Sequence, residues 1–97
     1  MSRLTQINSA TATLVGLGPQ MLMSVIVGAP QPYPPSLQID FHNVNAIGSI
    51  AASNLIMSLN LEEQMPVAFT HTFDGAMFPA GLVVKCSAAI SMTVETE

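Results

Sequence analysis

Charged side chains are scarce in this sequence. Of 97 residues, two are Lys or Arg and six are Asp or Glu, which makes 8% of the chain charged and gives a net charge of −4. A soluble domain usually has about 25% charged residues. Nucleic-acid binding requires several Lys and Arg side chains to neutralise phosphates. The composition therefore argues against nucleic acid as a partner.

Cysteine occurs once and tryptophan is absent. Cys86 alone cannot form a disulfide within the chain or supply a zinc-binding cysteine cluster, and its apolar surroundings favour a buried structural residue. A nucleophile and base pair of Cys86 with His42 or His71 has no local sequence signature. We therefore predict no catalytic residue and no enzyme activity.

Long hydrophobic runs are also missing. The apolar run MLMSVIVGA has about nine residues, whereas a membrane-spanning helix needs about 20. The uncharged stretch 44–61 is long enough, but Asn and Ser interrupt it throughout. The first residues contain one Arg followed by polar side chains, unlike a signal peptide. We expect no membrane span. We expect the chain to be made in a cytoplasm, with a virion as one destination.

Hydrophobic residues nevertheless make up 49% of the chain. A chain of this length folds as one domain with one core and leaves a large fraction of its surface outside that core. Large exposed apolar patches mark interaction surfaces. The composition therefore predicts a homo-oligomer, or a chain that binds other structural subunits.

The apolar pattern is that of short strands. In SLQIDFHNV, Leu37, Ile39 and Phe41 alternate with polar residues, which predicts a strand with one buried face. MLMSVIV reads as a strand covered on both faces. The stretch 47–61 fits a helical stripe in its first part, and the repeat at every second residue favours a strand over Leu55–Leu61.

Asp74-Gly75 lies between apolar residues, and this dipeptide is typical of a two-residue hairpin turn. We count six to eight short strands separated by Gly and Pro. The sequence therefore predicts an all-β protein, namely a small antiparallel β-sandwich of jelly-roll-like form or a barrel, as a single domain over 1–97.

Four prolines fall within six positions of the segment APQPYPPS. Pro32 and Pro35 have the P-x-x-P spacing of a polyproline ligand, but no Lys or Arg lies nearby and a strand follows at once. We favour a stiff crossover between strands that forms part of an interface. The predicted interface residues are Pro32, Tyr33, Pro34 and Pro35, with Tyr33 as the anchor.

A small set of polar residues could bind a ligand. Asp40 and His42 share one strand face, and His71 and Asp74 could approach them from another strand to form a mixed nitrogen and oxygen metal site. The spacing does not require such a site, and we predict no metal and no cofactor. Asp40 and His42, with Asn43 and Asn45, could instead bind sugar hydroxyls.

These observations favour a structural assembly subunit of a symmetric oligomer or larger particle, such as a virion decoration, neck or fibre protein. The alternative is a small oligomeric carbohydrate-binding, lectin-like module. For that alternative, Asp40, His42 and His71 are the candidate ligand-binding residues. The lack of tryptophan and the single tyrosine weaken it.

Overall fold

The computed structural model describes residues 3–28, 37–61, 69–88 and 91–97. Within these ranges no helix is long and apolar enough to cross a membrane. The regular structure of the described residues is eight β-strands and two short 3-10 helices, η1 (Ile47–Ser49) and η2 (Ala52–Asn54). The strands are β1 (Arg3–Ile7), β2 (Thr13–Leu17), β3 (Gln20–Val27), β4 (Leu37–His42), β5 (Leu55–Leu61), β6 (Phe69–Phe78), β7 (Gly81–Cys86) and β8 (Met92–Thr96).

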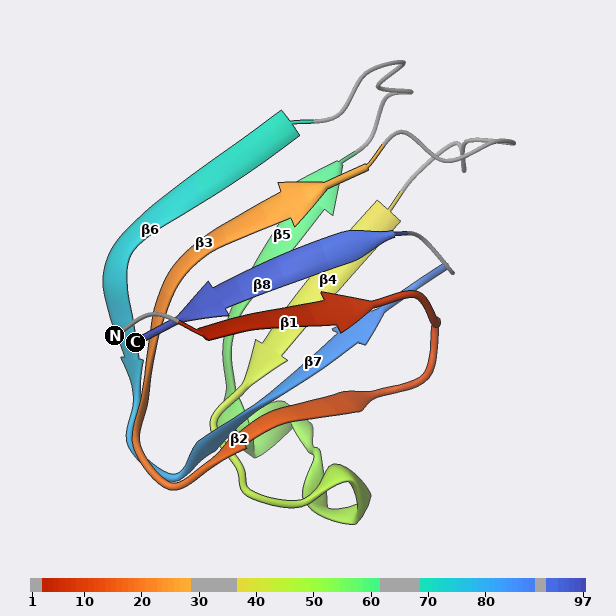
Figure 1. The fold of residues 1–97 in the computed structure, drawn as a ribbon. Helices are drawn as coiled ribbons and strands as arrows, with labels where there is room; N and C mark the ends of the chain where they lie inside the picture. Colours follow the sequence, from red (N-terminus) through yellow and green to blue (C-terminus); the bar gives the residue numbers. More distant parts are fainter. Residues whose placement is uncertain (1–2, 29–36, 62–68, 89–90) are drawn as a thin grey trace.

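The strands form two four-stranded antiparallel sheets that pack face to face (Figure 1). Sheet A has the order β1-β8-β3-β6, and sheet B has the order β2-β7-β4-β5. The pairs β1 with β8, β2 with β7, β3 with β6 and β4 with β5 are those of one long hairpin rolled up on itself. Eight strands wound in this way form a jelly roll. The predicted all-β antiparallel sandwich is confirmed.

Two connections at one end of the sandwich carry the rolled hairpin from one sheet to the other. Gly18 and Pro19 connect β2 of sheet B to β3 of sheet A, and Pro79 and Ala80 connect β6 to β7. Figure 1 shows both connections at the same end of the sandwich, where the paired chains bend together. The strands end at Gly and Pro residues as expected, and at these two positions the chain passes from one sheet to the other.

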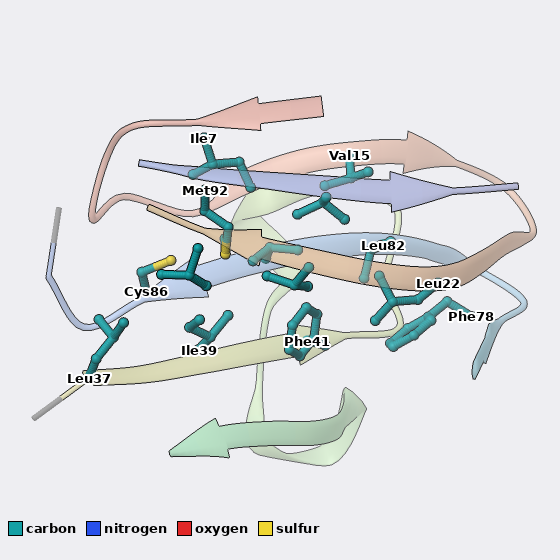
Figure 2. Close-up of a cluster of buried hydrophobic side chains, with 14 residues drawn as sticks. Ile7, Val15, Leu22, Leu37, Ile39, Phe41, Phe78, Leu82, Cys86 and Met92 are labelled. Atoms are coloured by element: carbon teal, nitrogen blue, oxygen red, sulfur yellow. The ribbon is translucent and has the colours of Figure 1, made fainter. Parts of the chain in front are cut away.

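The core lies between the two sheets. Figure 2 shows 14 buried hydrophobic side chains that point into this space. Leu37, Ile39 and Phe41 contribute from β4, as their alternation predicts, and all three are almost completely buried. The core draws on both sheets, so the rolled hairpin is held by apolar contact across its two halves as well as by backbone pairing.

The segment 43–54, between β4 and β5, holds both 3-10 helices and covers part of the outer face of sheet B. Val83 alternates with the inward-facing Leu82 and Val84, yet it is fully buried. Its cross-strand neighbour His42 is only 7% exposed. The helical pattern seen in the first part of the stretch 47–61 thus corresponds to these short turns, and the predicted strand Leu55–Leu61 is confirmed as β5.

The prediction of a hairpin tip at Asp74-Gly75 is wrong. Both residues lie inside β6, with φ of 54° at Asp74 and 80° at Gly75. In the register with β3, Leu22 pairs with Ala76 and Ser24 pairs with Thr72, so β6 contains extra residues at this point. Positive φ angles occur in β-bulges as well as in tight turns. Here β3 continues past the site as the pairing partner, and the dipeptide bends the strand without reversing it.

A substitution of Gly75 tests the bulge, because the positive φ at this position disfavours any residue with a side chain. A Cβ at this position would also lie 3.1 Å from Met21 Sδ. We expect Gly75→Ala to lower the free energy of unfolding by about 1–2 kcal/mol. Gly48→Ala is the control, because a Cβ there meets no atom within 4 Å. Chemical denaturation measures both, and equal stabilities would contradict the assignment.

Candidate interaction site

The structure divides the predicted ligand-binding residues between two sheets. Asp40 and His42 lie on the outer face of sheet B, opposite Lys85 and Val83 of β7. His71 lies on β6 of sheet A, opposite the buried Val25, so it occupies the inner face, at the exposed edge. Among the described residues no group of three His, Cys, Asp or Glu side chains could hold a metal ion. The three residues therefore do not form one site.

His42 takes part in a structural hydrogen-bond network. Its Nδ1 lies 2.8 Å from Asn54 Oδ1, which also accepts a bond from the Ala51 N–H. Asn54 Nδ2 in turn donates to the Ser49 carbonyl at 2.9 Å. With the amide in this orientation the Asn54 oxygen is an acceptor, so His42 Nδ1 is the donor. His42 and Asn54 together hold the segment 43–54 against sheet B.

Asp40 is tied to its neighbours on the sheet. Its Oδ1 accepts hydrogen bonds from Ser58 Oγ at 2.6 Å and Gln38 Nε2 at 2.7 Å. An open depression of about 440 Å³ beside it is lined by Ala10, Gln38, Asp40, Lys85, Cys86 and Ser87. This lining offers polar groups to a ligand, but its described residues include no aromatic ring on which a sugar could stack.

Cys86 is a buried free thiol. Burial raises its pKa from 9.0 to about 11, and the negative charge of Asp40 adds to the shift. At neutral pH the sulfur is therefore protonated, and a protonated thiol is a poor nucleophile. The environment agrees with the interpretation of Cys86 as a small buried hydrophobic residue.

The predicted interface residues Pro32, Tyr33, Pro34 and Pro35 lie outside the described residues. Their role in an interface stays a prediction. The described residues nevertheless include another set of candidates for contact with a partner, and it consists of large apolar side chains that the fold leaves exposed.

These exposed apolar side chains occur on both sheets and on η1. Leu4 on β1 is 68% exposed and Leu17 at the end of β2 is 70% exposed. The others are Ile26, Ile47, Leu55, Ile56 and Met77. Single exposed hydrophobic residues are ordinary on protein surfaces. Here they occur on a chain with very few charges, so few charged side chains separate them.

The two sides of the sandwich differ in how well they enclose the core. At the side formed by β1 and β2, Ile7 is 2% and Val15 is 3% exposed, and the Arg3 guanidinium bridges the strands by donating to the Val15 carbonyl at 3.0 Å. At the side formed by β5 and β6, Met57, Leu59 and Phe73 pack on the core but stay partly exposed. We call this second side the open side.

The sequence contains a signal for the open side in its distribution of charge. The residues from Phe41 to Leu61 carry no charge, and this stretch includes the whole of β5. An uncharged strand was visible in the sequence, but its position at a sheet edge depends on which strands pair with it.

Comparison with known proteins gives little guidance. No protein-family model matches the sequence, and no curated protein does. A chain from Bacillus endospore appendages, described as disulfide-linked pili, is similar with a TM-score of 0.46 and 13% identity, over 99% of this chain and 79% of that one. A chain of the virus-like particle of Macrobrachium rosenbergii extra small virus has a TM-score of 0.37 and 6% identity, over 99% and 77% of the respective chains. These values are too low to indicate a shared function.

The His42 network can be tested through Asn54. We expect Asn54→Ala to lower the free energy of unfolding by about 1–3 kcal/mol, because it leaves the buried His42 Nδ1 without its acceptor. Asn45→Ala is the control, since Asn45 is exposed and outside this network. Thermal unfolding followed by circular dichroism gives the comparison. If the two variants have the same melting temperature, Asn54 does not hold His42.

Proposed function

We propose that this chain is a structural subunit whose working state is a symmetric oligomer or a larger particle, such as a virion decoration, neck or fibre, and that it is not an enzyme. The observation that carries the proposal is the set of exposed apolar side chains on a chain with 8% charged residues. Apolar side chains that the fold leaves in water are stabilised when another chain covers them.

The outer face of sheet A supports the proposal. Two rows of cross-strand neighbours run over its four strands, Gln6-Thr93-Ile26-Thr70 and Leu4-Glu95-Ser24-Thr72. Glu95 is the one charged residue among them, and its carboxylate accepts a hydrogen bond from Ser24 Oγ at 2.9 Å. Covering uncharged polar side chains costs less desolvation free energy than covering charged ones, provided that the polar groups form hydrogen bonds with the second chain.

The edge strands of the two sheets also support self-association. β1, β2, β5 and β6 each have a single neighbour within the described residues, so each presents unpaired backbone N–H and C=O groups. Such edges are templates for pairing with another chain. A subunit that forms several contacts can use more than one of these edges, whereas a monomer has to protect all of them.

The observations favour assembly over the lectin-like alternative. Sugar-binding sites need polar groups beside an aromatic platform, and the polar depression around Asp40 has none among its described lining residues. Its polar groups also bind one another, since Gln38 Nε2 donates to Asp40 Oδ1 and the Gln38 N–H donates to Ser87 Oγ. We therefore propose no ligand for this depression.

Mass measurement in native solution tests the proposal. We expect light scattering after size-exclusion chromatography to give a defined multiple of 10.2 kDa at micromolar concentration. Raising the salt concentration should not dissociate it, because contacts between apolar side chains are not screened. A folded species with the mass of one chain at about 100 μM would overturn the proposal.

A further inference from the structure

β5 is the edge strand of sheet B on the open side. Its seven residues, LIMSLNL, include no charge, proline or glycine. The other edges carry features that discourage pairing: Arg3 on β1, a register shift next to Gly16 on β2, and the Asp74-Gly75 bulge on β6. β5 has one irregularity, near Ile56, where its register with β4 shifts. From Met57 onward it is regular and unprotected.

The hydrogen bonds of β4 establish which backbone groups of β5 point away from the sheet. Gln38 directs its backbone toward β7, because its N–H donates to Ser87 Oγ and its carbonyl accepts from the Ser87 N–H. Backbone groups alternate sides along a strand. Ile39 therefore points its groups toward β5, where its partner is Leu59.

The same alternation then applies within β5. Leu59 points its N–H and C=O back to β4, so Ser58 and Asn60 on either side of it point theirs away from β4. No strand lies there among the described residues. Ser58 and Asn60 thus offer two donors and two acceptors at the open edge, spaced for an antiparallel partner.

We propose that β5 pairs antiparallel with β5 of a second copy of this chain, around a two-fold axis at Leu59. This inference rests on the proposed self-association and names its surface. Ser58 then exchanges backbone hydrogen bonds with Asn60 of the second copy, and the reverse pair forms on the other side of the axis. The two copies of sheet B become one continuous eight-stranded sheet, a form of β-augmentation.

A second copy is the occupant that the strand fits. In this register Leu59 lies opposite Leu59 and Ser58 opposite Asn60, so apolar residues meet on the core side and polar residues on the outer side. A two-fold contact brings the same patch of both chains together. Because β5 carries no charge, no like charges meet across the axis.

The pairing of the two β5 strands also covers the open side, which removes apolar surface from water. The contact covers Met57, Leu59 and Phe73, the core side chains that a single chain leaves partly exposed.

A proline at Asn60 separates the pairing from the fold. Its ring removes an N–H that points to the open edge, so the β4–β5 ladder keeps its hydrogen bonds, and proline is tolerated at such edge positions. We expect Asn60→Pro to halve the mass of the smallest assembly in native mass spectrometry while the circular dichroism spectrum stays that of the parent. Asn60→Thr, which keeps the N–H, is the matched control and should assemble like the parent.

The outcomes distinguish this inference from the proposed function. If the parent is a multimer and Asn60→Pro has the same mass, pairing through β5 is wrong and self-association stands. If the parent itself is a monomer, both are wrong.

A cysteine cross-link tests the register without relying on the proline variant. Residues at the two-fold form a non-hydrogen-bonded pair, with Cα atoms about 4.5 Å apart, within disulfide range. We expect Leu59→Cys to form a covalent dimer under mild oxidation at least tenfold faster than Gln6→Cys, an exposed position on β1. The native Cys86 is buried and does not compete. Equal rates for the two variants would overturn the register around Leu59.

Discussion

Backbone pairing within one rolled hairpin is the constraint from which the rest of this structure follows. Every strand pairs with the strand that mirrors it along the chain, and the additional pairs β3 with β8 and β4 with β7 close the roll into two sheets. A sandwich made in this way has four edge strands. Unlike a closed barrel, it leaves backbone groups to be protected or used.

The two sides of the sandwich resolve this problem differently. At the side of β1 and β2, buried apolar residues and the bond from Arg3 to the Val15 carbonyl close the core. At the side of β5 and β6 the side chains of β5 that the structure describes include no fully buried core residue, and none of the labelled core side chains in Figure 2 comes from that strand. The scarcity of charge makes the open side costly to expose to water and easy to cover with a second copy.

The sequence predicted those features that depend on local pattern. The alternation in β4 identified that strand and its buried face, and the repeat in β5 identified a second strand, because strand periodicity is a property of neighbouring residues. Asp74-Gly75 was assigned to the wrong structure because its positive φ angles suit a tight turn and a bulge equally. Only the pairing with β3, about fifty residues away in the chain, decides between the two.

The site was harder to predict for the same reason. His42 was expected beside Asp40 on a polar face, and it lies there, but the segment 43–54 buries it, and its hydrogen-bond partner Asn54 is twelve residues away. The position of His71 on the other sheet, and of β5 at an edge, follow from the strand order alone. The interface expected at Tyr33 lies outside the described residues.

Amide hydrogen exchange of the assembled protein tests the central claim, which is that the open edge of β5 is paired in the working state. In a single chain the N–H groups of Ser58 and Asn60 point away from β4 and exchange quickly, while that of Leu59 is protected by its bond to Ile39. The account predicts that Ser58, Leu59 and Asn60 are all protected in the assembly. Rapid exchange at Ser58 and Asn60, with protection at Leu59 alone, would contradict it.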